Sequence, residues 1–288
     1  MRNEANILAE ILQWSLANKN LKAIILTSSR ANPNASPDLL SDYDIELIVS
    51  SLKIFTGDKW VSEFGDVIAS INEERPGWLT QLVLYSHGVR IDFQVHTKSH
   101  FLKSLKQNPL PTHWDIGYKI LLDKDNMLES LPAPTRLIYN INKPSPETFA
   151  KLINDFWWDT TYVAKSLWRD ELAYAKYMAD SIIRDGYVNT MLEWYIGLQN
   201  NWSVNTNKHG RWFKKYLDKK SWKEFQYIFS DADTGRNWQA LFATCRMFGR
   251  IAKEVATALQ YSYPYELERN ITSYLRKIRR LKKGAISF

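Results

Sequence analysis

Apolar residues near the start of the chain recur every three or four positions. The members of this pattern are Ile7, Leu8, Ile11, Leu12 and Leu16. Side chains at this spacing share one face of a helix, so the pattern predicts an amphipathic helix over residues 4–17. The β-rich run from Leu21 to Thr27 then predicts a short strand, and the prolines and asparagines of residues 32–38 predict a loop after it.

Three further runs favour strands. Residues 43–49 form one, and residues 78–86 and 89–96 form two more, which are separated by the turn-like pair His87-Gly88. This arrangement is not the regular strand–helix alternation of a doubly wound parallel sheet. We therefore expect a mixed sheet with flanking helices in the first half of the chain.

The pattern changes near residue 140. Prolines punctuate residues 131–146, and Ser145-Pro146-Glu147 combines a capping serine, a first-turn proline and an acid that suits the start of a helix. Helical periodicity dominates from there. Further helices are expected at about 171–200, 208–228, 236–260 and 265–282. We therefore predict an α+β protein, with a sheet domain at residues 1–140 followed by a helical bundle domain at residues 141–288.

The composition is that of a folded protein, with 45% hydrophobic and 24% charged residues. No apolar run approaches the roughly 20 residues that span a bilayer. The start of the chain lacks the apolar core of a signal peptide, because Glu10 and Gln13 interrupt it. The single cysteine, Cys245, excludes an internal disulfide and suits a buried apolar position. We expect a cytoplasmic protein with no membrane segment.

Positive charge concentrates in the second half. The formal net charge is +7, and residues 145–288 carry 23 Lys and Arg against 15 Asp and Glu. Six of these cations crowd into residues 276–283. They suit the exposed C-terminal end of a helix, or a nucleic acid or anionic surface. The helix end is the interpretation we favour, so we do not expect a nucleic-acid partner.

A cluster of acids carries the clearest chemical signal. Residues two apart on a strand point the same way, so Asp42, Asp44 and Glu46 share one face. On the neighbouring predicted strand, Asp92 also lies on the polar face. Carboxylates about 6–7 Å apart along a strand repel each other unless a cation lies among them. Asp42, Asp44 and Asp92 therefore fit a Mg²⁺ site, although solvated acidic strand faces are also common.

The loop after the first strand supplies matching donors. Thr27-Ser28-Ser29-Arg30-Ala31-Asn32 offers hydroxyls, backbone N–H groups and a guanidinium. Such donors suit the oxygens of a triphosphate. The alternative is an ordinary turn rich in serine and asparagine.

Together these segments resemble a known family. The loop and the Asp-x-Asp pair resemble the signature of the DNA polymerase β-like nucleotidyltransferase superfamily, which is Gly-Ser, a loop and then Asp-x-Asp. More specifically, the chain resembles the aminoglycoside 6-adenylyltransferases (streptomycin adenylyltransferases), nearly from end to end. The segments that carry the resemblance are Ser28 to Asn34, Ser41-Asp42-Tyr43-Asp44-Ile45, Leu121-Leu122-Asp123-Lys124-Asp125, Phe156-Trp157, Tyr162 to Glu171, Lys208, Phe213 to Leu217 and Tyr261-Ser262-Tyr263-Pro264.

The resemblance implies a nucleotidyltransferase catalytic domain at residues 1–140 and a helical substrate- and nucleotide-binding domain at residues 141–288. It implies Mg²⁺-dependent transfer of AMP from ATP to a hydroxyl group of an aminoglycoside, foremost streptomycin, with release of pyrophosphate and inactivation of the antibiotic. Asp42 and Asp44 match the family's metal-binding pair. Asp92 matches its third carboxylate, which is a metal ligand or the general base.

The resemblance also implies residues that bind the two substrates. We expect Ser29, Arg30 and Lys208 around the ATP phosphates, although Lys208 also fits a plain basic helix face. An aminoglycoside is a polycation and calls for acids and aromatic faces. Our candidates are Asp155, Trp157 and Glu171, and the alternative is that the tryptophans belong to the core and the acids to a solvated helix surface.

The chain departs from the family's pattern in three places. The signature glycine is Ser28, so a backbone position that allows positive φ carries a side chain. Ser86-His87 replaces an expected acidic pair, and Phe93-Gln94-Val95-His96 replaces apolar residues and a threonine. These departures remove no metal ligand. They leave open the same chemistry on another acceptor (another antibiotic, a protein or a nucleic acid), or a protein that binds nucleotide without catalysis.

Overall fold

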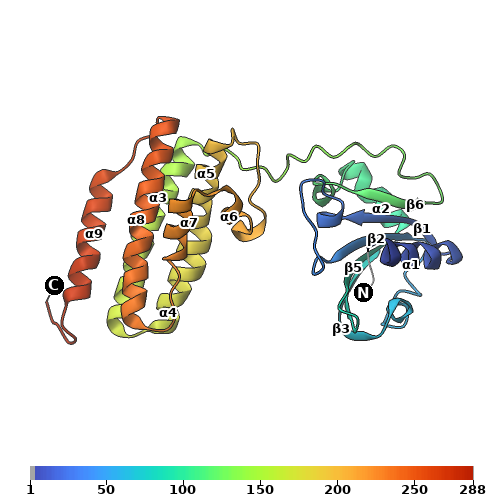
Figure 1. The fold of residues 1–288 in the computed structure, drawn as a ribbon, viewed down its shortest axis with the longest axis horizontal. Helices are drawn as coiled ribbons and strands as arrows, with labels where there is room; N and C mark the ends of the chain where they lie inside the picture. The colour runs from blue at the N-terminus through green and yellow to red at the C-terminus, as the bar shows by residue number, and fades with distance from the viewer. Residues whose placement is uncertain (1–3, 288) are drawn as a thin grey trace. The chain divides into compact units, whose positions relative to one another are not determined.

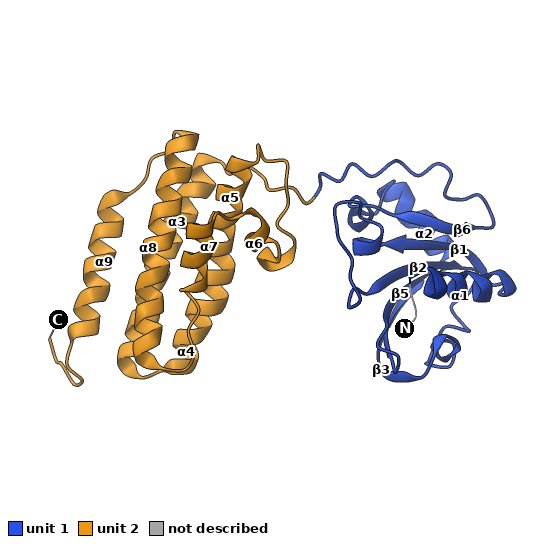
Figure 2. Cartoon of the chain, viewed as in Figure 1, with its two compact units in different colours: residues 1–138 blue, residues 139–288 orange. Residues whose placement is uncertain are grey.

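The computed structural model describes residues 4–287 of the chain. The chain divides into two compact units, residues 1–138 and residues 139–288 (Figure 2). Unit 1 contains a β-sheet with helices beside it, and unit 2 is built from helices (Figure 1). This order of a mixed sheet followed by helices confirms the predicted α+β class.

Unit 1 is organised around a sheet whose six described strands have the order β3-β4-β5-β2-β1-β6. Neighbouring strands are antiparallel except β2 and β5, which run parallel. In chain order the strands are β1 (Leu21–Thr27), β2 (Tyr43–Val49), β3 (Val67–Arg75), β4 (Trp78–Tyr85), β5 (Arg90–Thr97) and β6 (Lys119–Asp123). The four strands expected from the sequence are confirmed as β1, β2, β4 and β5.

Helices occur in both units. In chain order they are α1 (Glu4–Ala17), α2 (Lys98–Gln107), α3 (Pro146–Arg169), α4 (Leu172–Lys176), the π-helix η4 (Tyr177–Val188), α5 (Asn189–Gln199), α6 (Phe213–Tyr216), α7 (Lys219–Gln226), α8 (Thr234–Leu259) and α9 (Tyr265–Arg280). The helix expected at residues 4–17 is confirmed as α1. The start expected at Ser145 is confirmed as well, because its side-chain oxygen accepts a hydrogen bond from the Thr148 N–H at 3.2 Å.

The two faces of the sheet are covered differently, because side chains alternate along each strand. On one face, Ile7 and Ile11 of α1 pack with the apolar residues of β2, β4 and β5. On the other face, Phe101 of α2 and Trp114 cover apolar residues of β1 and the far end of β2. Asp44 and Asp92 belong to this second face. The incomplete cover is what leaves room for polar side chains at the beginning of β2 and β5.

Unit 2 buries a core made by α3, η4, α5, α8 and α9. Phe156 of α3 and Phe248 of α8 stack in this core, with 3.6 Å between their ring centroids. Cys245 is buried, as expected. Among residues 4–287, no helix combines the length and the apolar character that crossing a membrane requires.

The stretch from 208 to 228 is not the continuous helix that its periodicity suggested. It contains the 3-10 turn η5 (Lys208–Gly210), then α6, and then α7. Asn207 and His209 both have positive φ, which is incompatible with a right-handed helix. Asp218 then starts α7 by accepting hydrogen bonds from two N–H groups of its first turn.

Candidate active site

Asp44 and Asp92 lie side by side near the middle of the sheet. They are direct partners in the parallel pairing of β2 and β5, so their side chains leave the same face. Thr27, the last residue of β1, is the partner of Asp44 on its other side. Asp42 lies two residues earlier, in the loop that enters β2. The pleat of two strands thus brings together the carboxylates that the sequence pattern singled out.

The loop after β1 turns toward Asp44. It forms the 3-10 turn η1 (Ser28–Arg30), and Ser28 has a left-handed backbone with φ of 59°. This conformation costs a residue with a side chain about 1–2 kcal/mol, a cost that glycine avoids. The Ser28 side chain forms a hydrogen bond with the Asp44 carboxylate. The residue that replaces the signature glycine therefore reaches the acidic cluster, and the half-buried Ser29 follows it.

The acidic cluster is short of positive charge. Burial raises the pKa of Asp44, and the charges of Asp92 and Asp42 raise it as well, against the lowering effects of Ser28 and Arg90, so the pKa lies at about 6 instead of 3.8. A carboxylate pKa near 6 means that its negative charge is poorly compensated. Carboxylates in this condition bind a hard divalent cation readily.

One cation already lies among these carboxylates. Arg90, two residues before Asp92 on β5, donates from Nε and Nη2 to the two Asp92 oxygens, each at 2.8 Å. Its Nη1 lies 3.7 Å from Asp42 Oδ2. In the described part of the chain, no three acidic, histidine or cysteine side chains are arranged to hold a metal ion. The oxygen donors that Mg²⁺ prefers are present, but two of the three carboxylates are turned toward Arg90.

Arg30 is placed differently from what the sequence suggested. Its side chain is only 7% exposed, and Nη1 donates to Glu4 Oε2 at 2.6 Å. Its guanidinium also lies over the Tyr43 ring, 3.8 Å from the centroid. Its other donors reach the backbone oxygens of Asp38, Ser41 and Asp42. Arg30 is thus occupied in holding the loop that presents Asp42, and it does not offer free donors to a phosphate.

Glu46 is a buried charge that the sequence analysis placed on the polar face without assigning it a role. Its side chain is 3% exposed, and it accepts hydrogen bonds from His113 Nε2 at 2.7 Å and from Trp114 Nε1. His96 Nε2 lies 3.5 Å from its second oxygen. Burial alone would raise the pKa of Glu46, but the hydrogen bonds from His113 and His96 outweigh it and lower the pKa from 4.5 to about 2.

The histidines of this network come from separate segments. His96 lies on β5 on the same face as Asp92, and His113 lies in the 3-10 turn η3 (Thr112–Trp114). Alternation alone places Glu46 and His96 on the face of Asp44 and Asp92. Nothing local in the sequence predicts that His113 and Trp114 fold back over Glu46.

The remaining site candidates belong to unit 2. Lys208 is exposed and stands in the short turn η5. Asp155 on α3 forms an ion pair with Lys151 one turn earlier. Glu171 follows α3, has a side chain 49% exposed, and lies 3.9 Å from an Arg169 nitrogen. Lys208 and Glu171 are thus open to solvent, whereas Asp155 is already paired with Lys151 and would have to leave it to meet a ligand.

The structure corrects the expectation for Trp157. Its side chain is 1% exposed and belongs to the core of unit 2, so it cannot stack on a sugar while the unit is folded. Its neighbour Trp158 is 60% exposed. Trp157 lies four positions after the buried Ile153 and three before the buried Thr160, so helical spacing places it on the face of α3 that meets the core.

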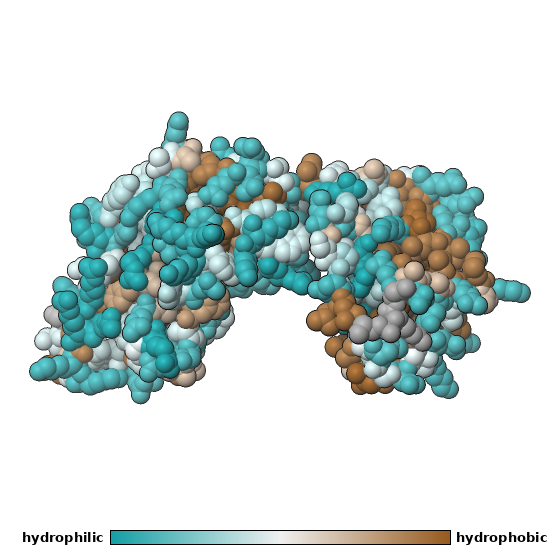
Figure 3. All heavy atoms as spheres, in the orientation of Figure 1, coloured by the Kyte–Doolittle hydropathy of each residue, from teal (hydrophilic) through white to brown (hydrophobic). Residues whose placement is uncertain are grey.

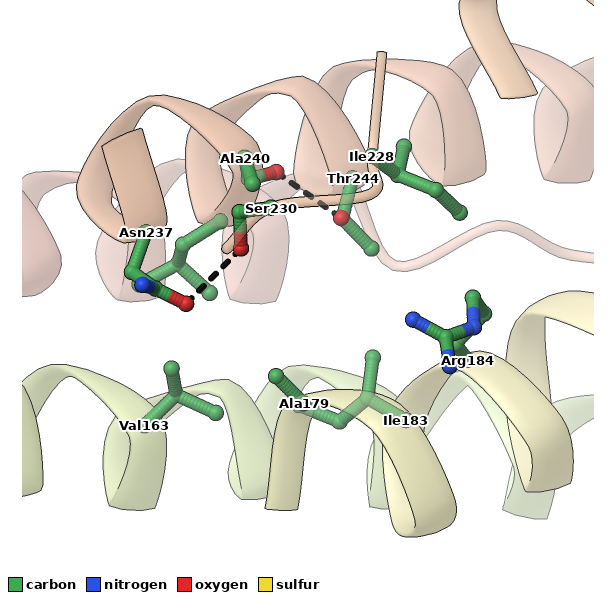
Figure 4. Close-up of a pocket in the computed structure, with 10 residues that line it drawn as sticks. Val163, Ala179, Ile183, Arg184, Ile228, Ser230, Asn237, Ala240 and Thr244 are labelled. Carbon is green, nitrogen blue, oxygen red and sulfur yellow. Dashed lines mark hydrogen bonds between the residues drawn. The ribbon is translucent and has the colours of Figure 1, made fainter. Parts of the chain in front are cut away.

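A small pocket lies inside unit 2. Figure 4 shows it between the helices that carry Val163, Ala179 and Ile183 and the segment that carries Ser230 and Asn237. Ser230 and Asn237 are hydrogen-bonded to each other at 2.8 Å. The pocket holds none of the predicted site residues, and its walls are largely apolar.

The chain is similar to known proteins over nearly its whole length. A family model described as streptomycin adenylyltransferase matches residues 1–278. An aminoglycoside 6-adenylyltransferase from Campylobacter jejuni is 30% identical over 295 residues, covering 99% of this chain and 98% of that protein. One from Bacillus subtilis (strain 168) is 28% identical, covering 95% and 97%. A crystal structure of an aminoglycoside 6-adenyltransferase from Bacillus subtilis is 25% identical, covers 98% of this chain and all of its own, and gives a TM-score of 0.48.

Proposed function

The chain belongs to the streptomycin adenylyltransferase family, and on that premise we propose that it transfers AMP from ATP to a hydroxyl group of an aminoglycoside, foremost streptomycin. The observation that carries the proposal is the pairing of Asp44 with Asp92 across β2 and β5, with Asp42 in the loop before β2. Pyrophosphate is the second product, and the modified antibiotic is inactive.

The Mg²⁺ that the family implies fits the donors present. Asp42, Asp44 and Asp92 would hold it, because their clustered carboxylate oxygens are ligands that Mg²⁺ prefers. When bound, the ion neutralises the triphosphate and makes its α-phosphorus easier to attack.

The transfer exchanges one bond at phosphorus for another. The acceptor hydroxyl oxygen forms a bond to the α-phosphorus, and the bond from that phosphorus to the β-phosphate oxygen breaks, so pyrophosphate leaves with the electron pair. The hydroxyl proton goes to Asp92, unless Asp92 serves only to hold the metal. Both roles need a carboxylate at residue 92.

The other residues of the proposal bind substrates. Ser29, in the turn η1 after β1, and Lys208 in unit 2 bind phosphate oxygens of ATP. Asp155 and Glu171 attract the cationic acceptor, and the exposed Trp158 takes the stacking role first expected of Trp157. Arg30 acts on the reaction only by holding the loop of Asp42.

The test is an adenylylation assay with a mass readout. Purified protein with Mg²⁺ and ATP should add one adenylyl group to streptomycin, and Asp92→Asn should lower the rate by about 10³-fold or more, because a carboxylate that accepts a proton or holds a metal is lost. The control is Asp66→Asn, an exposed acid in a loop before β3, which should keep full activity.

Two results would count against the proposal. If the folded wild-type protein modifies no member of an aminoglycoside panel, the proposed acceptor class is wrong. If Asp92→Asn keeps wild-type activity, the assignment of the carboxylates is wrong.

A further inference from the structure

Arg90 occupies the place in the acidic cluster where a metal ion would have to bind. Its fork of two N–H donors is bonded to both oxygens of Asp92, at 2.8 Å each. Its third nitrogen faces Asp42 at 3.7 Å. A planar guanidinium that engages both oxygens of a carboxylate uses one lone pair of each, so a cation cannot approach the carboxylate from that side.

The contact between Arg90 and Asp92 is local, and Arg90 can leave it without a change in the backbone. Arg90 and Asp92 are two residues apart on β5, so their side chains leave the same face of the strand. The Arg90 side chain is 44% exposed, whereas the Asp92 side chain is 16% exposed. Arg90 can therefore swing into solvent about its own side-chain torsions, while Asp92 remains in the cluster.

Arg30, in contrast, is held in place by its surroundings. Arg30 is 7% exposed and is bonded to the side chain of Glu4 and to backbone oxygens, so its removal breaks a buried network. Arg90 has only carboxylates as described hydrogen-bond partners, and these are the groups that a metal needs.

We propose that Arg90 is the resident counter-ion of the metal site, and that a divalent cation binds by displacing its guanidinium from Asp92 and Asp42. The inference rests on the proposed function, because it takes these carboxylates as the metal ligands. In the metal-free protein, Arg90 offsets part of the negative charge of the cluster and keeps Asp92 oriented. Breaking the contacts of Arg90 costs free energy, and this cost lowers the affinity of the site for the metal alone. The displaced guanidinium is then available to oxygens of the incoming triphosphate.

Two substitutions separate displacement from a simple effect of charge. Arg90→Gln removes both the charge and the fork. Arg90→Lys keeps the charge but loses the two parallel hydrogen bonds. If Arg90 only repelled the metal through its charge, Arg90→Lys would bind metal like the wild type. If the metal must break the two bonds, Arg90→Lys would bind it more tightly.

The matched control is Arg75→Gln. Arg75 on β3 also bonds an acid two residues away on its strand, with Nε and Nη2 on Glu73 Oε1 at 2.8 and 2.6 Å. Its pair is exposed on both sides and lies on an edge strand, away from the Asp44–Asp92 pair. It reproduces the chemistry of the change without touching the acidic cluster.

The experiment measures binding of Mn²⁺ alone, by the loss of the free-ion signal in electron paramagnetic resonance. Mn²⁺ takes the same oxygen ligands as Mg²⁺. We expect Arg90→Gln to bind Mn²⁺ about three- to tenfold more tightly than the wild type, and Arg90→Lys at least about twofold more tightly. The gain is of this size because the metal no longer has to break an ion pair that has two hydrogen bonds and is partly exposed to solvent. Arg75→Gln should match the wild type, and circular dichroism checks that all four proteins are folded.

The possible results distinguish a failure of the Arg90 displacement from a failure of the proposed function. Wild-type affinity in Arg90→Lys, or no gain in Arg90→Gln, overturns the displacement of Arg90 and leaves the proposed function standing. No Mn²⁺ binding by any of the four proteins, with or without ATP, overturns both. Tighter binding in both Arg90 variants supports the inference even if the acceptor proves not to be an aminoglycoside.

Discussion

Two arginines near the same carboxylates have opposite tasks because their surroundings differ. Arg30 is 7% exposed and fixes the backbone that carries Asp42, whereas Arg90 is 44% exposed and holds carboxylate oxygens that it can release. From the sequence alone, both residues are simply arginines close to the acidic residues. Only burial and partners separate a positioning residue from an exchangeable counter-ion.

Arg30→Ala should destabilise unit 1 and weaken metal binding together. The change leaves Glu4 and the backbone oxygens of the Asp42 loop without a donor, so we expect the free energy of unfolding to fall by about 3 kcal/mol. Urea unfolding measures this loss, and Arg75→Ala serves as a control with a change below about 0.5 kcal/mol. If Arg30→Ala keeps normal stability but has a raised KM for ATP, Arg30 binds phosphate and does not mainly hold the loop.

The Glu46 network makes the stability of unit 1 depend on pH in two directions. The pKa of Glu46 is lowered from 4.5 to about 2 in the folded protein, so its contribution is present above pH 4.5 and is lost as the pH falls toward 2. The pKa of His113 is raised above 6.5, because its bond to Glu46 and the charges of Glu46 and Asp44 outweigh the lowering effect of burial. Its contribution is complete below pH 6.5 and fades as the pH rises through the raised value.

Glu46→Gln should therefore be most harmful between pH 4.5 and 6.5. In that window we expect it to lower the free energy of unfolding by about 2–3 kcal/mol, because the buried carboxylate loses charge-assisted hydrogen bonds. Denaturant unfolding at several pH values should show the gap from the wild type narrowing as the pH falls toward 2. A gap that stays constant with pH would mean that the ionised form of Glu46 is not what stabilises the fold.

At the scale of elements, the sequence patterns predicted the helices and strands that bury apolar side chains. They failed where a strand is exposed or where the backbone conformation interrupts a helix. α1 and β5 follow their predicted limits closely because each buries one stripe of side chains, and β1 and β2, which are buried on both faces, stand out as short β-rich runs. β3 was not predicted because nearly all of its residues are exposed on both faces, which leaves no apolar alternation to detect. The helix expected at 208–228 is divided because Leu217 and Asp218 have extended backbones between α6 and α7, and positive φ at His209 limits η5 to one turn.

The same reasoning explains which parts of the candidate site could be predicted. Alternation on two strands is a local signal, and it placed Asp44 and Asp92 on one face correctly. The burial of Arg30, by contrast, depends on Glu4 at the start of α1, 26 residues earlier. Contacts between residues so far apart in the chain arise from tertiary packing, and a local sequence pattern does not predict them.

The start of α3 offers a test at the level of a single element. The Ser145 side-chain oxygen accepts a hydrogen bond from the Thr148 N–H, and Pro146 follows in the first turn. Ser145→Ala should lower the free energy of unfolding of unit 2 by about 1 kcal/mol, because one N–H loses its acceptor. Ser145→Asp keeps an acceptor and should stay near the wild type in thermal unfolding. Equal losses in both variants would show that the cap is not what matters there.

At the scale of the whole molecule, the chain passes from unit 1 to unit 2 through a segment without regular structure, and Asp115 anchors its last residues in unit 1. The Asp115 carboxylate accepts hydrogen bonds from Thr135 N–H at 2.6 Å and from the N–H groups of Leu137 and Ile138 at 3.2 Å. Burial would raise the Asp115 pKa, but these bonds outweigh it and lower the pKa. The exposed Arg136 sits inside this anchored stretch.

Loss of that anchor should expose the connection to proteases. Asp115→Asn replaces an acceptor of several backbone hydrogen bonds with an amide, so we expect trypsin to cut after Arg136 about tenfold faster or more. Gel analysis with mass determination of the fragments follows the cut, and Asp125→Asn is the control within unit 1. An unchanged rate of cleavage would mean that Asp115 does not govern this segment.

The exposure of β3 has a consequence for how the protein behaves at high concentration. β3 is the outer strand of the sheet, and Ile68 and Ile71 are 62% and 66% exposed on it. Figure 3 shows hydrophobic side chains at the surface of unit 1 around this strand. A free strand edge with apolar side chains recruits strands from other molecules, and the charged run Glu73-Glu74-Arg75 at its end opposes that recruitment. The charged end of β3 therefore helps to keep the protein from associating through this edge, in addition to its pairing with β4.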